Sequence, residues 1–204
     1  TESKVQFLSQ PTSYADCPSS VETLETHMSW VFLTDQFVYK LKKPVRYEFL
    51  DFSTLDARYR DCEAELHLNR RLAPEIYLGI IPLIVDRIGN LHLEEEGQIV
   101  DWLVKMRRLP RDSMLDWAIE RQTVQKKDIR ELAGLLARFY KRQPNADISP
   151  ETYRNRLSET VNANLNELLL PAYGLPENRV YAIAVGQLAF LSRHTEQIDR
   201  RVRS

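Results

Sequence analysis

A chain of 204 residues is long enough to form one domain or two small lobes around a buried core. Its 43% hydrophobic and 28% charged residues are typical of an ordinary globular protein. The net charge of −1 excludes the strong positive field of most proteins that bind nucleic acids or anionic membranes, so we expect neither partner.

The two cysteines, Cys17 and Cys62, do not form a CxxC pair, so we expect free thiols in a reducing compartment. No apolar run approaches the ~18 residues that a bilayer-spanning helix needs, and no secretory signal opens the sequence. The sequence lacks an initiator Met, which suggests trimmed ends. These features predict a cytoplasmic protein and leave its oligomeric state open.

The first half of the chain predicts a β-rich region. A short helix over residues 2–10 and a loop up to Ser20 come first. Thr34 and Asp35 separate two apolar segments and are short enough for a hairpin turn. We expect strands over residues 21–24, 29–33, 36–41, 79–85, 91–94 and 98–106.

A long helix is predicted over residues 53–72, where Ser53 and Asp56 resemble a capping box. Residues at steps of three and four predict one buried face: Leu55, Tyr59, Cys62, Leu66 and Asn69. Glu63 and Glu65 lie on opposite flanks of that face. Either glutamate could reach inward, and periodicity does not choose between them.

Lys40 lies among apolar residues in the strand that precedes this helix. A lysine in a strand, paired with a glutamate on the next helix, is how kinase-like folds hold ATP phosphates. Strand alternation places Lys42 on the face of Lys40 and Lys43 on the opposite face. The alternative is a solvated basic strand edge.

The connection between the first two strands would lie over the phosphates in a kinase-like lobe. Residues 25–28 contain no glycine, and no GxGxxG motif occurs among the six glycines of the chain. Phosphate contacts would therefore use backbone N–H groups and the hydroxyls of Thr26 and Ser29. An ordinary polar loop is the alternative.

The chain turns helical after residue 110. We expect a short helix from Asp112, its N-cap, to Ile119, and further helices from Lys127, over 149–170 with Ser149 as N-cap, and over 179–201. The sequence thus predicts an α+β fold with two lobes. A β-rich lobe spans residues 1–106, a link spans 107–110, and an incomplete helical lobe spans 111–204.

Six segments carry a family resemblance: Glu25-Thr-His-Met-Ser-Trp-Val-Phe-Leu33, Val38-Tyr-Lys-Leu-Lys-Lys-Pro44, Phe49-Leu-Asp-Phe-Ser-Thr-Leu55, Cys62-Glu-x-Glu-Leu-x-Leu-Asn-Arg-Arg-Leu-Ala-Pro74, Val104-Lys-Met-Arg-Arg-Leu-Pro110 and Leu132-Ala-x-Leu-Leu-Ala-Arg-Phe139. Together they resemble the bacterial aminoglycoside phosphotransferase-like family, in a branch sometimes fused to a P-loop ATPase domain. The resemblance implies a kinase-like fold with ATP between its lobes. In that fold Lys40 would contact the α- and β-phosphates, with Glu65 as its ion-pair partner and Glu63 as the fallback. The link that meets the adenine edge would be Lys105, Met106, Arg107 and Arg108.

The sequence departs from the family in two places. Tyr140 stands where the family has a His, and the catalytic His-Gly-Asp-Leu segment with its metal-binding Asp does not occur. We therefore expect no catalytic or metal-binding residue in this sequence, and Mg²⁺ only in a complete protein.

Two functions fit these expectations. One is the N-terminal portion of a phosphotransferase that binds ATP and, when complete, transfers its γ-phosphate to an unidentified small-molecule hydroxyl. The alternative is a shortened, catalytically inactive relative that binds a nucleotide or a protein and acts as a regulatory module.

Overall fold

The computed structural model describes residues 2–47, 50–93, 96–144 and 147–203. Its contacts divide the chain into two units, Thr1–Gly134 and Leu135–Ser204. Among the described residues every strand lies at or before Arg107, and the chain after it is helical or irregular. The predicted α+β class is therefore confirmed. In the described part of the chain, no helix has both the length and the apolar character needed to cross a membrane.

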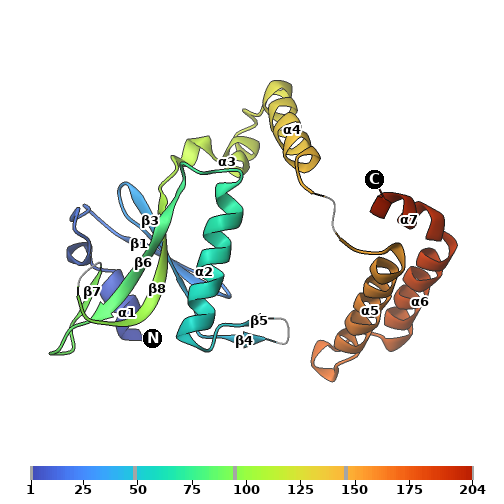
Figure 1. Ribbon diagram of the computed structural model, residues 1–204, viewed down its shortest axis with the longest axis horizontal. Helices are drawn as coiled ribbons and strands as arrows, with labels where there is room; N and C mark the ends of the chain where they lie inside the picture. The colour runs from blue at the N-terminus through green and yellow to red at the C-terminus, as the bar shows by residue number, and fades with distance from the viewer. Residues whose placement is uncertain (1, 48–49, 94–95, 145–146, 204) are drawn as a thin grey trace. The chain divides into compact units, whose positions relative to one another are not determined.

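The first unit is built on an antiparallel six-stranded sheet in the order β1-β2-β3-β8-β6-β7 (Figure 1). The predicted strands are observed with small shifts at their ends: β1 (Glu22–Glu25), β2 (Ser29–Leu33), β3 (Phe37–Lys42), β6 (Tyr77–Val85), β7 (Leu91–Leu93) and β8 (Gln98–Arg107). Glu94, which the predicted strand over residues 91–94 included, lies outside the described residues. A two-stranded hairpin, β4 (Arg46–Tyr47) and β5 (Leu50–Asp51), lies in the connection between β3 and the following helix.

The main hydrophobic core lies on the face of the sheet that the N-terminal segment covers. Helix α1 (Glu2–Leu8) and the 3₁₀ turn η1 (Pro11–Ser13) bring Leu8 and Tyr14 against this face. Burial raises the pKa of the Tyr14 phenol, whose hydroxyl donates a hydrogen bond to the Leu8 carbonyl at 2.5 Å. The sheet contributes Phe32, Tyr39, Leu41, Ile81, Leu83 and Leu103 to this core.

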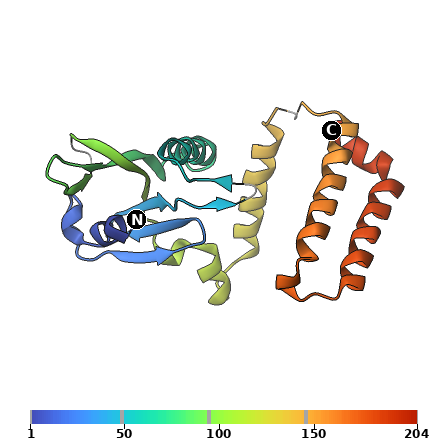
Figure 2. The same cartoon turned by 90° about the horizontal axis from the view of Figure 1, so that it is seen from below.

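Helix α2 (Leu55–Arg70) packs mainly on β8 and β6, on the other face of the sheet (Figures 1 and 2). The predicted capping box at Ser53 and Asp56 is wrong. Thr54 is the N-cap, because its Oγ1 accepts the Ala57 N–H at 3.1 Å. The Ser53 hydroxyl instead donates to Asp51 Oδ1 at 2.5 Å.

The sheet-facing side of α2 is less apolar than its periodicity predicts. Cys62 is fully buried, as predicted, but the other buried residue of the helix is Arg58. Leu55, Tyr59 and Leu66 are only half-buried, and Asn69 is exposed and donates to the Glu65 carbonyl at 2.8 Å. A charged side chain therefore occupies part of the predicted apolar stripe.

The link after β8 leads to the 3₁₀ turn η2 (Arg111–Ser113), helix α3 (Leu115–Glu120) and helix α4 (Lys126–Lys141). The prediction of Asp112 as a helix N-cap is wrong. Asp112 lies inside η2, and α3 begins after Met114.

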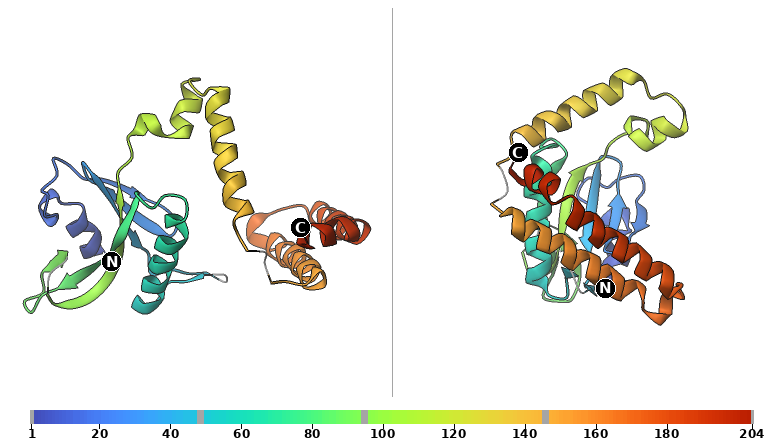
Figure 3. Two further views of the ribbon diagram at one scale, coloured as in Figure 1. Left: turned by 45° about the horizontal axis from the view of Figure 1, so that its top comes forward. Right: turned by 90° about the vertical axis from the view of Figure 1, so that its right-hand side faces the viewer.

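The second unit contains helices α5 (Pro150–Leu168), α6 (Glu177–Arg193) and α7 (Thr195–Arg203), with the 3₁₀ turn η3 (Pro171–Tyr173) joining α5 to α6. Helices α5 and α6 lie side by side (Figures 1 and 3). Ser149 caps α5 as predicted, because its Oγ accepts the Thr152 N–H at 3.0 Å. The predicted single helix over 179–201 is broken at His194, whose φ of −110° and ψ of 26° are not helical.

Candidate functional site

Lys40 on β3 and Glu65 on α2 meet over the face of the sheet on which α2 lies. Lys40 Nζ donates to Glu65 Oε1 at 3.0 Å and to Oε2 at 3.2 Å. Glu63 is exposed and accepts a hydrogen bond from the Tyr59 hydroxyl, which raises the pKa of that phenol. Of the two glutamates that periodicity left open, Glu65 is therefore the one that pairs with Lys40.

Lys42 and Asp61 complete a group that we call the Lys40 cluster: Lys40, Lys42, Asp61 and Glu65. The Lys42 ammonium contacts the carboxylates of both Asp61 and Glu65. Its side chain is 6% exposed, whereas the Lys40 side chain is 29% exposed. Glu65 is thus shared by an enclosed lysine and a lysine that is open to solvent.

The contacts of the Lys40 cluster favour the charged forms of Glu65 and Lys42. Burial alone would raise the pKa of the Glu65 carboxyl, but hydrogen bonds and positive charge from Lys42 and Lys40 outweigh it, so this pKa is lowered. Burial alone would lower the pKa of Lys42, but Asp61 and Glu65 outweigh it and raise this pKa. Two ammonium groups therefore face two carboxylates.

Lys43 lies on the opposite face of the sheet, as strand alternation predicts. Its ammonium contacts Glu25 and lies 4.8 Å from the centre of the Trp30 ring. Lys43 is therefore a natural control for Lys40, because it is a lysine of the same region that faces the other side.

An apolar surface adjoins Lys40 on its own face of the sheet. Residues paired across antiparallel strands share a face. The register pairs Val31 with Lys40 and Leu24 with Val31, and it pairs Val38 with Met106 on the same face. Because α2 packs mainly on β8 and β6, these side chains stay partly open, with Leu24 47% exposed. A flat, apolar group could stack on this surface beside the ammonium.

The structure does not offer Thr26 and Ser29 to a phosphate in the way we expected. The Thr26 hydroxyl donates to the Ser29 carbonyl at 2.9 Å and accepts from the Ser29 N–H at 3.0 Å. Ser29 is also buried, at 2% exposure. These groups close the turn between β1 and β2, so a phosphate contact would require the turn to open.

The four residues expected to meet an adenine edge use their backbones in and beside the sheet. Lys105 and Met106 pair with residues on both neighbouring strands of β8. The N–H of Arg107 donates to the Ile76 carbonyl, and that of Arg108 donates to the Gln36 carbonyl, each at 2.8 Å. The link therefore begins later than expected, after Arg107. Met106 contributes to the Lys40 face through its side chain instead.

Lys105 points to the face opposite Lys40. Its Nζ lies 4.8 Å from the Phe37 ring centre and 5.6 Å from that of Tyr39. It lines a cavity of about 410 Å³ between the N-terminal segment and the sheet, together with residues such as Tyr14 and Asp16. This cavity is separated from the Lys40 cluster by the sheet itself.

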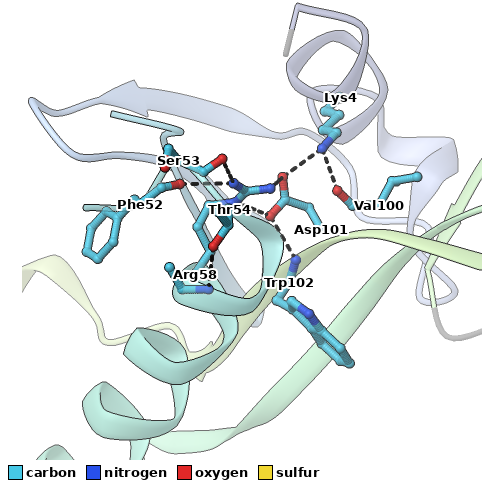
Figure 4. Close-up of polar contacts among 9 residues, drawn as sticks. Lys4, Phe52, Ser53, Thr54, Arg58, Val100, Asp101 and Trp102 are labelled. Atoms are coloured by element: carbon cyan, nitrogen blue, oxygen red, sulfur yellow. Dashed lines mark hydrogen bonds and ion pairs between the residues drawn. The ribbon is translucent and has the colours of Figure 1, made fainter. Parts of the chain in front are cut away.

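A second charged group was not predicted from the sequence. We call it the Asp101 cluster: Lys4, Arg58 and Asp101 (Figure 4). Asp101 Oδ1 accepts from Arg58 Nε at 2.8 Å, and Oδ2 accepts from Arg58 Nη2 at 3.1 Å and from Lys4 Nζ at 2.7 Å. Arg58 and Asp101 are buried. A carboxylate within the apolar strand 98–106 was the available signal, since a buried charge needs a partner.

Comparison with known proteins gives relatives but no activity. No family model matches the chain, and no solved structure matches it. It is similar to uncharacterized proteins from Mycobacterium bovis and from two strains of Mycobacterium tuberculosis. Each is 32% identical over 150 residues, which cover 72% of this chain and 28% of the relative. The matched region thus spans less than a third of the length of these relatives.

Proposed function

We propose that the first unit holds the phosphates of ATP on Lys40, within a kinase-like phosphotransferase. In a protein of the length of the mycobacterial relatives, the γ-phosphate would pass to a small-molecule hydroxyl. The observation that carries the proposal is the ion pair between Lys40 and Glu65, in which Lys40 remains partly exposed beside an apolar surface. The resemblance to the aminoglycoside phosphotransferase-like family supports the same assignment.

The Lys40 cluster is suited to the exchange that phosphate binding demands. When Lys40 turns toward a phosphate oxygen, the half-buried Glu65 would lose a partner, which is costly where the carboxylate is partly removed from water. Lys42 offsets this cost because its ammonium stays on Glu65 and Asp61. Lys40 can therefore leave the carboxylate without exposing an unpaired buried charge.

The apolar surface of Leu24, Val31, Val38 and Met106 would hold the adenine ring. Aromatic and apolar groups stack through dispersion and removal of water, which requires a flat and dry contact. Lys40 then lies at the side where the phosphates would extend. Base, ribose and phosphates would follow the face of β1, β2 and β3.

The chemical step would need groups that this sequence does not contain. A His-Gly-Asp-Leu segment is absent from its 204 residues. In kinase-like enzymes an Asp orients the acceptor hydroxyl and a second Asp holds Mg²⁺. We therefore assign nucleotide binding to this chain, whereas the catalytic base, the metal and the acceptor site would belong to a protein of the length of the mycobacterial relatives.

An NMR titration of the chain with ATP tests the proposal, because it detects weak binding and locates it. We expect methyl signals of Leu24, Val31 and Val38 to shift with ATP concentration. The Lys40→Met variant should lose most of this response, and Lys43→Met should keep it. Unchanged spectra at millimolar ATP, or shifts confined to the cavity beside Tyr14 and Lys105, would refute the assignment.

A further inference from the structure

Two of the charged side chains through which helix α2 reaches the sheet, Arg58 and Glu65, lie on one face of the helix. Arg58 and Glu65 are seven residues apart, which is nearly two full turns, so they point the same way about 10 Å apart along the axis. Between them Cys62 is fully buried, while the neighbouring Tyr59 and Leu66 are half-buried. The anchoring of Arg58 at the start of the helix is thus one of the contacts that set the position of Glu65, beside those of Asp61 and Arg70.

Every nitrogen of the Arg58 side chain has an acceptor. Nε and Nη2 donate to the two oxygens of Asp101, and Nη1 donates to the Phe52 carbonyl at 3.0 Å and to the Ser53 carbonyl at 3.4 Å. A planar guanidinium bonded in this way has one orientation. Arg58 therefore fixes the start of α2 to both β8 and the segment that precedes the helix.

Asp101 lies where groups from both faces of the sheet can reach it. The pairing of β3 with β8 ends at Leu41 and Leu103, so no paired β3 residue lies opposite Asp101. Arg58 approaches from the α2 side and Lys4 from the α1 side (Figure 4). Lys4 Nζ also donates to the Val100 carbonyl at 2.7 Å. The carboxylate is consequently held by both helices.

We propose that Lys4, in the N-terminal helix, is a positioning residue for Glu65. Through Asp101 it orients Arg58, and Arg58 sets α2 so that Glu65 meets Lys40 and Lys42. The consequence for ATP relies on the proposed function, but the positioning of α2 does not. The N-terminal helix would then do more than cover the core. It would also hold Glu65 in position on the opposite face of the sheet, where the ligand would bind.

Removing the Lys4 side chain should loosen the start of α2 without unfolding the protein. Its side chain is 21% exposed, and its loss leaves Arg58 and Asp101 paired with each other. The other end of α2 is held separately, where Arg70 Nε donates to the Tyr77 carbonyl at 2.7 Å. The start of the helix is thus the part expected to move, and Cys62 lies one turn from Arg58.

Alkylation of Cys62 by iodoacetamide measures this movement. Burial raises the pKa of its thiol to about 12, so it reacts only when α2 opens, whereas Cys17 is exposed and marks the fast phase in the same sample. We expect Lys4→Met to accelerate the Cys62 phase about tenfold through local opening. Lys4→Arg should restore slow reaction, and Lys43→Met should match the wild type.

Global stability must be measured beside the alkylation rate. Urea unfolding of the same variants shows whether Lys4→Met raises the Cys62 rate beyond its effect on the unfolding equilibrium. A rate that rises only in proportion to that equilibrium, or that does not change, overturns the inference. If the NMR signals of the wild-type protein do not shift with ATP, the proposed function fails, yet the Cys62 alkylation rates still decide the role of Lys4. If it binds, Lys4→Met should also weaken ATP binding.

Discussion

The Asp101 cluster and the Lys40 cluster use the same kind of interaction on one helix, yet they differ in how closed they are. In the first, the side chains of Arg58 and Asp101 are 8% and 4% exposed. In the second, Lys42 is equally enclosed but Lys40 is 29% exposed. Lys4 in the first cluster is also 21% exposed, but its Nζ donates to the Val100 carbonyl as well as to Asp101. Lys40 Nζ donates to Glu65 alone among the described hydrogen bonds, and Glu65 keeps Lys42 as a second counter-charge. The difference teaches that a lysine open to solvent becomes a candidate binding group when its one carboxylate partner keeps a second counter-charge.

The two clusters also differ in the side chain that faces the carboxylate: an arginine in the enclosed pair and a lysine in the open one. Arg58 has a planar fork whose donors match a carboxylate and two carbonyls, so it suits a fixed contact. Lys40 carries a compact charge on a flexible stem and can exchange one oxygen ligand for another. The comparison predicts that changes in the first cluster alter stability and that changes at Lys40 alter binding.

The largest expected effect is on stability, in the Asp101 cluster. Asp101→Asn leaves the Arg58 guanidinium buried without its counter-charge, which should lower the free energy of unfolding by about 3–5 kcal/mol. Urea denaturation measures the change. Asp56→Asn is the matched control, because the side chain of Asp56 is 71% exposed in its pair with Arg60 and its loss should have little effect. Equal effects of the two variants on the free energy of unfolding would contradict the assignment of the Asp101 cluster to stability.

Within the Lys40 cluster, the enclosed lysine should matter more for stability than the open one. Lys42→Met removes charged hydrogen bonds to Glu65 and Asp61 and should cost about 2 kcal/mol. Lys40→Met should cost less than about 1 kcal/mol, because solvent reaches Lys40 and screens its contact with Glu65, which still pairs with Lys42. Both values come from urea denaturation at neutral pH. The reverse order would show that Lys42 does not hold Glu65.

The pH dependence of stability sharpens the role of Glu65. Its pKa is lower in the folded protein than in the unfolded chain, so the unfolded chain takes up the proton first as pH falls. The stabilising contribution is therefore complete above the ordinary carboxyl pKa of 4.5 and is lost as pH falls through the folded value. Glu65→Gln should lower stability by about 1–2 kcal/mol at pH 7. The difference from wild type should shrink at pH 3, and a constant difference would contradict this account.

Part of this arrangement could be read from the sequence, because local patterns determine it. The alternation of residues 36–43 separates Lys40 and Lys42 from Lys43, and the strand–helix–strand order predicts that Lys40 lies near the following helix. Periodicity placed Glu63 and Glu65 on two flanks of one helix, and only the path of α2 over β8 decides between them.

Long-range contacts could not be read in the same way. Lys4 and Asp101 are 97 residues apart, and nothing in the local sequence predicts that they meet. The coverage of the core by α1 and η1 was missed for the same reason. The backbone pairing of Lys105 and Met106 depends on the register of three strands, which the predicted link did not take into account.

The most direct test of the central claim compares ATP with adenosine on the same protein. Lys40 would contact only the phosphates, so it should not affect adenosine binding itself. It should govern the preference for ATP, which is the dissociation constant of adenosine divided by that of ATP. We predict that Lys40→Met lowers this ratio about tenfold, the loss of one charged contact, while Lys43→Met leaves it unchanged. Dissociation constants from NMR titrations give the ratio for each variant. Equal ratios in wild type and Lys40→Met would contradict the assignment of Lys40 as the phosphate-binding lysine.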